Sequence, residues 1–439
     1  MAEKTSTSDF STCIATDQTA PGTTIKRSEA QTEEPPDGGL RAWATVAGGF
    51  MRLPRHLFGR PPHSRSSDPP VDFYVREFMT NKTPSEIAWI GSCQIALQFI
   101  LGLPVGKAFD AGYFHHLMIT GSLIYCVALW TLSLATPNQY YLVPKLTPLG
   151  LGIGLGLTFL PALGIAAHHF SRRRGLALGI ITSGASIGGI VFPFLLNRLL
   201  FSHGFAAGVR ATAALITGLL LLANLLMRPR YPKTRAGAPA LHRVLTDVPY
   251  MVFVLAGLVI MLALFYPIFY LQLYAIKRGV REQLAFDTVR LPLNTGGVVG
   301  RLLPPLLADS VGSFAVIIPT TFLAAACVLS MLATAAAARG VVAIALVYGA
   351  LNAAFVSLTP ALLAELSANR GEVGLRMGVW FSVNAVAALA GQPLSGALIQ
   401  GDFKWSTVFA GACLFAGGCI LVFSWFLRGE GRRGGGGRV

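Results

Sequence analysis

Long apolar runs separated by short polar connections make up most of this chain. A membrane-spanning helix needs about 20 apolar residues, and eleven of the runs reach that length. The runs lie near residues 41–53, 86–108, 117–136, 146–168, 175–197, 206–227, 249–275, 287–308, 313–337, 341–363, 376–399 and 406–427. The pattern predicts an all-α membrane protein with eleven clear spans and a first helix, 41–53, that is truncated or disrupted.

The spans divide into two groups of six around a basic connection. Two such repeats are typical of transporters in which the substrate passes between two helical bundles. The predicted parts are a disordered cytosolic tail at 1–35, an N-terminal six-helix bundle at 36–227, a cytosolic central loop at 228–248, a C-terminal six-helix bundle at 249–427 and a Gly/Arg-rich tail at 428–439.

The composition excludes a soluble protein. Charged residues make up 13% of the chain and hydrophobic residues 53%, whereas about a quarter of a soluble domain is charged. The formal net charge of +15 would also suit a nucleic-acid binder. The basic residues lie mainly in short connections, however, where they set the topology of a membrane protein. We therefore expect a surrounding lipid bilayer and no nucleic-acid partner.

Positive charges also predict the orientation. Short loops rich in Lys and Arg stay in the cytoplasm. With twelve spans, Arg172–Arg174, the central loop and the C-terminal tail all fall on one side. Both termini of this multi-pass protein are therefore expected in the cytoplasm, with the chain in the plasma membrane or, alternatively, the vacuolar membrane. The connection at Lys277 and the basic block after Phe50 disagree with this assignment.

The sequence contains no pattern typical of an enzyme or a metalloprotein. Its six cysteines are scattered, without the spacing of a metal site or a disulfide framework. A Ser/His/Asp arrangement and a histidine box are also missing. We expect neither catalysis nor a bound cofactor or metal.

Four short motifs lie at helix ends and identify the chain more sharply. They are Asp37, Gly38, Gly39 and Trp43 at the start of the first run; Gly106, Asp110 and Gly112 at the end of the second; Arg172, Arg173 and Arg174 before the fifth; and Asp309 and Gly312 after the eighth. An Asp beside a Gly is usually only a turn, and an arginine run is usually a topological anchor. The two Asp loops, however, occupy equivalent places in the two halves.

These motifs resemble those of the major facilitator superfamily, and within it the monocarboxylate transporter-like proteins of fungi. The resemblance covers about residues 35–50 and 73–427. It implies two six-helix bundles around a central cavity, and secondary active transport of a small organic anion or related metabolite by alternating access. Coupling to protons by symport is implied by the family alone, because the sequence has no clear carboxylate inside a span.

Two other functions fit the same sequence. An exporter of a fungal secondary metabolite would share the fold and the motifs. A non-transporting membrane sensor, or an inactive remnant, would explain the damaged first helix. The motifs therefore indicate the family and leave the substrate and the direction of transport open.

Arg301 is the strongest candidate for a substrate contact. It lies inside the eighth span, where an ionised group usually faces the bundle interior or a water-filled path, and its guanidinium suits a carboxylate. The resemblance implies the same role, since monocarboxylate transporters hold substrate with an arginine on this helix. Alternatively, Arg301 reaches toward the cytoplasm or pairs with Asp309. Asn294, two turns earlier on the same helix, is a further candidate.

Other polar side chains inside the spans are weaker candidates. Tyr266 and Tyr270 share one face of the seventh helix with Tyr274, where they would line a cavity for a flat substrate or belong to an interfacial aromatic belt. The amides are expected to hydrogen-bond between helices. These amides are Gln94, Gln98, Asn224, Gln272, Asn352, Asn384 and Gln392.

The first helix is the anomaly of the chain. Residues 41–53 reach about 20 Å, against a hydrocarbon core of about 30 Å. The following segment, 51–72, is rich in arginine and proline, and each Arg at mid-membrane costs about 2.5–3.5 kcal/mol. Either this segment is a translated intron or out-of-frame stretch that replaces native residues, or the first helix is genuinely broken or re-entrant. We favour the first explanation.

Overall fold

The computed structural model describes residues 38–52, 84–134, 147–230, 241–277, 282–333, 338–367, 372–399 and 402–434. Within these ranges the regular structure is all helical, as the apolar runs predict. The elements are α1 (Leu40–Arg52), α2 (Pro84–Ile100), α3 (Gly102–Asp110), α4 (Phe114–Leu132), the π-helix η4 (Thr147–Leu151), α6 (Gly152–Gly164), α7 (Ala166–His169), α8 (Arg174–Leu226), α9 (Leu241–Leu245), α10 (Val248–Leu264), α11 (Tyr266–Lys277), α12 (Glu282–Val311), α13 (Ser313–Ser330), α14 (Ala338–Leu366), α15 (Val373–Ala397) and α16 (Lys404–Gly434).

Ten segments of the described chain are long and apolar enough to cross a membrane. The eighth predicted span, α12, is not among them, although it has 30 residues. It carries Arg290, Arg301 and Asp309 within a sequence that is otherwise apolar toward its end. These charged residues distinguish α12 from the other predicted spans.

Helix α8 contains two of the predicted spans. Its 53 residues include Gly204, whose φ of 79° and ψ of 174° are not helical. A residue with a side chain strongly disfavours such a conformation, whereas glycine adopts it freely. The spans predicted at 175–197 and 206–227 are therefore two helices that meet at this glycine.

The described part of helix α1 corresponds to the run predicted at 41–53. It has 13 residues, which is about 20 Å at 1.5 Å per residue. It packs against α8, where Gly184 allows the backbone of Phe50 to approach closely. Residues 53–72 of the anomalous segment and the tail at 1–35 lie outside the described residues. At the other end, α16 continues into the Gly/Arg-rich tail as far as Gly434.

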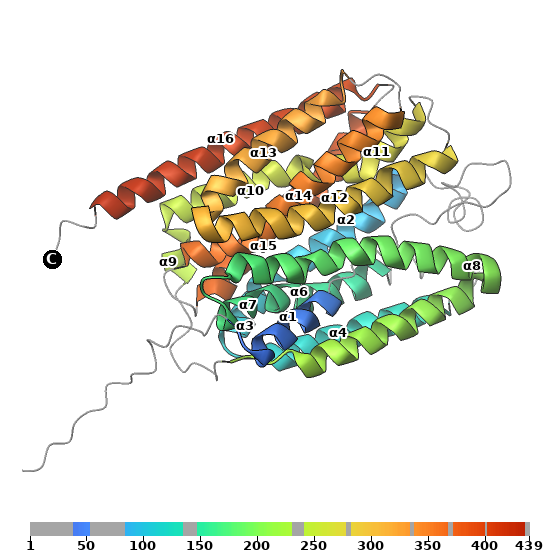
Figure 1. The fold of residues 1–439 in the computed structure, drawn as a ribbon, viewed down its shortest axis with the longest axis horizontal. Coiled ribbons are helices and arrows are strands. Elements are labelled where there is room, and N and C mark those ends of the chain that lie inside the picture. The colour runs from blue at the N-terminus through green and yellow to red at the C-terminus, as the bar shows by residue number, and fades with distance from the viewer. Residues whose placement is uncertain are drawn as a thin grey trace, which may run out of the picture. The chain divides into compact units, whose positions relative to one another are not determined.

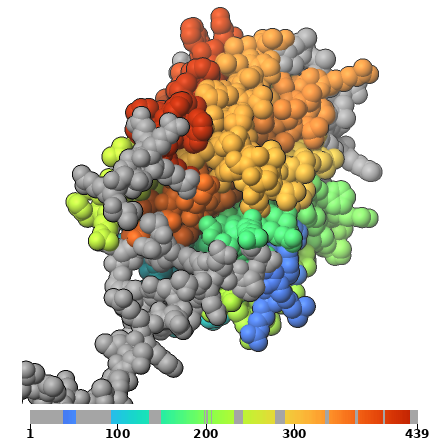
Figure 2. All heavy atoms as spheres, turned by 60° about the vertical axis from the view of Figure 1, so that its left-hand side comes forward, coloured from blue at the N-terminus to red at the C-terminus, as the bar shows by residue number. Residues whose placement is uncertain are grey.

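Helices that are distant in the sequence lie side by side (Figure 1). In the first half α1 packs on α8 and α4 packs on α6, while in the second half α12 packs on α14 and α10 packs on α16. Two further contacts join the halves, α8 with α12 and α15 with α2 and α3. Figure 2 shows the green residues of α8 lying directly against the yellow and orange residues of the second half.

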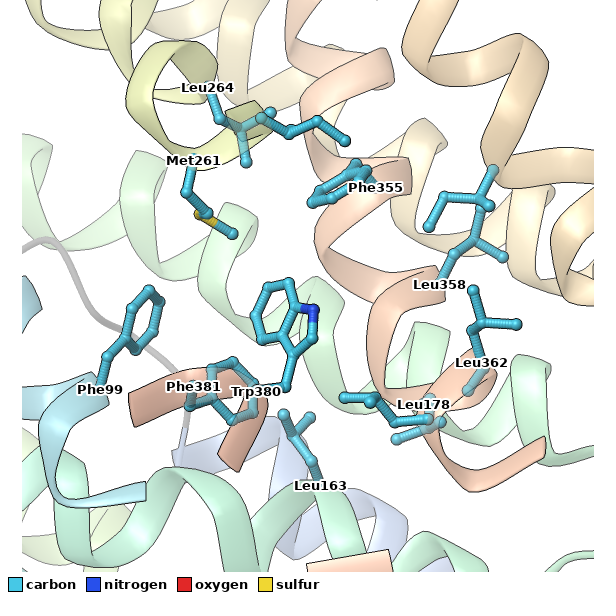
Figure 3. Close-up of a cluster of buried hydrophobic side chains, with 14 of the residues drawn as sticks. Phe99, Leu163, Leu178, Met261, Leu264, Phe355, Leu358, Leu362, Trp380 and Phe381 are labelled. Atoms are coloured by element: carbon cyan, nitrogen blue, oxygen red, sulfur yellow. The ribbon is translucent and has the colours of Figure 1, made fainter. Parts of the chain in front are cut away.

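The two halves also share an apolar centre (Figure 3). Trp380 is 1% exposed and lies among Leu163, Leu178 and Phe355, which come from α6, α8 and α14. Beside it, the Phe381 ring stands 5.2 Å from Phe99 of α2 and 5.1 Å from Phe159 of α6. The centre between the two halves, where the family resemblance implies a cavity, is therefore closed by packed side chains at this level.

Candidate functional site

Two aspartates bind the starts of helices in the opposite half of the chain. The two carboxylate oxygens of Asp110 accept hydrogen bonds from the backbone N–H groups of Gly374 and Leu375, at 2.9 and 2.7 Å. The first N–H groups of a helix have no partner inside the helix, and they carry its positive dipole end. Asp110, at the end of α3, therefore supplies both an acceptor and a negative charge to α15.

Asp309 makes the same contact with α8. Its carboxylate oxygens accept hydrogen bonds from the backbone N–H groups of Gly175 and Leu176, at 2.7 and 2.9 Å. We call these two contacts the aspartate clamps, and the end of the molecule where they lie the clamped end. Together they tie α3 to α15 and α12 to α8. Both pairs join helices of different halves.

Glycines give the clamps their close approach. A Cβ atom on Gly175 would lie 2.7 Å from the Oδ1 atom of Asp309, so a larger residue would push the carboxylate away. Gly112 and Gly312, with φ of 83° and 94°, shape the turns that follow the two aspartate helices. The Asp loops found in the sequence are thus real turns, and their aspartates reach across the molecule.

The remaining family motifs lie near the same end. The Trp43 ring contacts Phe170 edge-on, with ring centroids 5.2 Å apart. Arg172 and Arg173 are exposed just before α8, and Arg174 begins it. Gly38 and Gly39 precede α1 with positive φ values of 155° and 104°. Asp37 lies outside the described residues.

Arg301 reaches from α12 to the backbone of α8. Its Nη1 atom donates a hydrogen bond to the carbonyl oxygen of Thr182. Its Nε atom is buried without a hydrogen-bond partner. Among the described residues no ion pair includes Arg301, so the alternative pairing with Asp309 is not made. The carboxylate of Asp309 instead binds the start of α8.

A second polar contact lies beside this one. The hydroxyl groups of Thr182 and Ser357 are 2.8 Å apart and join α8 to α14. Both residues are buried, Ser357 completely. Thr182 therefore links α8 to two helices of the second half, through its carbonyl oxygen and through its hydroxyl group.

The other sequence candidates are bonded to protein groups. The Nδ2 atom of Asn294 donates to the carbonyl oxygen of Arg290 on its own helix, at 3.0 Å. The Tyr266 hydroxyl lies 2.9 Å from the Thr407 hydroxyl, and the Tyr270 hydroxyl donates to the carbonyl oxygen of Gln392 at 3.0 Å. The structure does not bring these three side chains into contact with Arg301.

Comparison with known proteins now settles the family. Residues 73–351 match the family model described as Major Facilitator Superfamily. The chain belongs to the major facilitator superfamily. The match begins after α1 and the anomalous segment, so the helices that carry both clamps and Arg301 lie within it, apart from α15.

Curated relatives of this major facilitator chain are fungal transporters. It is 30% identical over 437 residues to the MFS-type transporter dbaD of Emericella nidulans, with 96% of each chain covered. It is 31% identical over 405 residues to the aspyridones efflux protein apdF of the same fungus, with 90% of this chain and 80% of that protein covered.

Solved transporters have the same fold. The Escherichia coli fucose:proton symporter FucP superposes with a TM-score of 0.68 at 15% identity, over 87% of this chain and 98% of that chain. The human organic anion transporter MFSD10 gives 0.68 at 14% identity over the same shares. At these identities the likeness shows the fold alone. The family match and the fungal relatives, together with this fold, make the chain a multi-pass major facilitator transporter, and such proteins move small molecules across membranes.

Two of the amides predicted to hydrogen-bond between helices do so, and a third does not. Asn224 and Asn352 do bond between helices, to Ser122 and to the carbonyl oxygen of Leu264. The amide of Gln392, by contrast, is fully buried and neither of its side-chain polar atoms has a partner.

Trp380 is a buried residue that no sequence pattern distinguishes. A single tryptophan in an apolar run is indistinguishable from ordinary core, yet its Nε1 atom is buried without a partner. Gly257 of α10 makes room for it, since a Cβ there would lie 2.8 Å from Nε1. Its position at the centre could not be read from the run alone.

An ion pair that the sequence did not suggest lies at the clamped end. Arg376 of α15 is only 5% exposed and its Nη1 atom is 2.6 Å from the Oδ2 atom of Asp247. Its guanidinium also lies over the Tyr250 ring, 5.0 Å from the ring centroid. Asp247 caps α10, so this pair fastens α15 to α10 within the second half.

Proposed function

We propose that this transporter exports a secondary metabolite with an anionic group, such as a carboxylate, by alternating access. The observation that carries the proposal is the guanidinium of Arg301, which lies within a predicted span and has no carboxylate partner among the described residues. It lies ten residues before Val311, the end of α12, which is about 15 Å along the helix. The efflux role named for the relative apdF supports an exporter over an importer.

The chemistry of Arg301 favours an anion. A charged side chain within a membrane span is costly unless a counter-charge or water accompanies it. Here the guanidinium has one neutral acceptor, the carbonyl oxygen of Thr182, and a buried Nε without any. A carboxylate can accept two parallel hydrogen bonds from a guanidinium. A bound organic anion would therefore provide the missing charge and the missing acceptor.

Proton coupling through a protein carboxylate is not part of this proposal. Among the side chains that the structure describes, carboxylates lie only at or near helix ends, as Asp110, Asp309 and Glu365 do. Uptake of a small monocarboxylate is the second candidate. It is favoured by the combination of Arg301 with the Gly38–Gly39–Trp43 motif at the start of α1.

Transport by purified protein in liposomes tests the proposal. Radiolabelled benzoate and its neutral isostere benzamide serve as probes, with larger aromatic acids added as a panel. We expect flux of the acids, no flux of benzamide above protein-free liposomes, and at least a tenfold loss of acid flux in Arg301→Gln. The matched control is Arg339→Gln, which removes an exposed charge at the start of α14. Equal flux of benzoate and benzamide, or full flux in Arg301→Gln, would refute the proposal.

The same assay addresses the sensor or remnant alternative. A protein that inserts correctly and moves none of the probes would favour a non-transporting chain, in line with its 13-residue first helix. Transport by the chain as it stands would show that the short α1 is sufficient.

A further inference from the structure

The bond from Arg301 to Thr182 crosses from one half of the transporter to the other. Arg301 lies on α12, and Thr182 lies on α8 two turns after the helix begins at Arg174. The helices are in backbone contact here, because Gly179 has no side chain to hold off the carbonyl group of Arg301. Separation of α8 from α12 at this level must break the Arg301–Thr182 bond.

The bond also holds the only charge at this depth among the described side chains. The clamps lie at the helix starts, with Asp309 bonded to Gly175 and Leu176. Thr182 is eight residues from Arg174, about 12 Å further into the membrane. If α8 and α12 parted with no ligand present, the guanidinium would lose its one acceptor inside the span. Until water filled the opening, the charge would have no partner, and a buried charge without a partner is strongly unfavourable.

We infer that Arg301 and Thr182 form a latch that keeps the empty carrier closed at the clamped end and that only an organic anion releases. The inference rests on the proposed function, in which Arg301 binds the anionic group of the substrate. Hydrogen bonds between a guanidinium and a carboxylate are about twice as strong as those to a neutral acceptor. A carboxylate therefore displaces the Thr182 carbonyl oxygen, and the guanidinium remains paired while the helices separate.

The latch gives the transport cycle a defined coupling. With an anion bound, the carrier can open at the clamped end. Without a bound anion, opening would separate the Arg301 guanidinium from its acceptor on Thr182, so the empty carrier stays closed. Each return step then requires an anion as well, and the transporter exchanges one organic anion for another instead of moving a single anion in one direction. An exporter of this kind would draw in a second, abundant carboxylate as it releases its product.

The first test needs no ligand. Leu178 is 1% exposed and lies one turn closer to the clamped end than Thr182. The thiol introduced by Leu178→Cys reports opening there, measured as the labelling rate with a membrane-impermeant maleimide. The parent protein without this substitution gives the background from the native cysteines. We expect Arg301→Gln to raise the labelling rate at least fivefold, while Arg339→Gln leaves it unchanged.

A second variant serves as a control for a general loss of packing between the helices. Ser357→Ala removes the hydroxyl contact to Thr182 and retains the guanidinium latch, so it should raise the rate by less than twofold. An unchanged rate in Arg301→Gln would overturn the latch. So would an equal rise in Ser357→Ala and Arg301→Gln, because the charge would then have no special role.

The second test measures exchange directly. Liposomes containing the transporter are loaded with benzoate, with benzamide or with buffer, and the uptake of labelled benzoate is followed. We expect uptake to be at least tenfold faster with benzoate inside than with benzamide or buffer. Equal uptake into all three would overturn the exchange inference and leave anion transport standing. No benzoate uptake under any loading would overturn anion transport and exchange together.

Discussion

Replacing Asp309 with asparagine should increase the fraction of molecules that are open at the clamped end. The size of the increase can be calculated from the two hydrogen bonds of the carboxylate. The carboxylate accepts from Gly175 at 2.7 Å and from Leu176 at 2.9 Å. An asparagine has one carbonyl oxygen, so one N–H keeps an acceptor and the other faces an NH₂ group. A hydrogen bond to a charged group contributes about 1.5–3 kcal/mol. Because about 1.4 kcal/mol is a factor of ten, Asp309→Asn should favour the open state by roughly 10–150-fold.

The population of open molecules is the quantity to measure. Double electron–electron resonance between two spin labels measures the separation of the two halves. The labels are placed on His116→Cys of α4 and Ser310→Cys of α12, both exposed at the clamped end. The native cysteines are replaced by serine for this purpose. Asp309→Asn should add or enlarge a long-distance population, and Asp110→Asn should do so to a similar extent, since its hydrogen bonds are also 2.9 and 2.7 Å. Asp402→Asn, an exposed aspartate, is the control. If the distance distribution of Asp309→Asn equals that of this control, the clamp does not hold the two halves together.

Three further predictions follow from named contacts. Gly106→Val should weaken the packing of α3 on α15 and lower the melting temperature, because the backbone of Gly374 occupies the space of a side chain; Gly218→Val, where nothing lies within 4 Å, should not. Asp247→Ala removes the closest carboxylate of Arg376 and leaves Glu372, 3.8 Å from its Nε atom. Because a hydrogen bond to a charged group contributes about 1.5–3 kcal/mol, the substitution should destabilise the protein by that amount, to be read from denaturant unfolding in detergent; a loss below about 0.5 kcal/mol would contradict a stabilising pair. Sequencing the transcript should show that residues 51–72 are not encoded in frame by the mature message, and an in-frame message would establish the short first helix as native.

The apolar runs predict most of this fold because a spanning helix needs only length and continuous hydrophobicity. They do not predict where two spans merge. The runs at 175–197 and 206–227 form one assigned helix, and only the backbone angles of Gly204 reveal the break. Glycine is common in membrane helices, so its presence alone gave no sign of it.

The site was harder to predict because its contacts connect distant residues. The sequence shows that Asp110 and Asp309 follow equivalent spans, but their partners lie 264 and 134 residues away. Thr182, which accepts from Arg301, is 119 residues away and looks like any threonine in an apolar helix. A charge within a span is visible in the sequence, whereas the neutral backbone group that receives it is not.

The aspartate clamps have the geometry of a dimer interface. Each half offers one acidic loop, placed after its second span, and one glycine-led helix start, placed at its fifth. The acidic loop of each half binds the helix start of the opposite half. In the same way, a two-fold symmetric homodimer uses one patch on both of its subunits. A single ancestral half with both features could have paired with a second copy of itself before the two were joined. The present chain keeps that self-recognition within one molecule, and its two halves, made as separate polypeptides, carry the contacts needed to find each other.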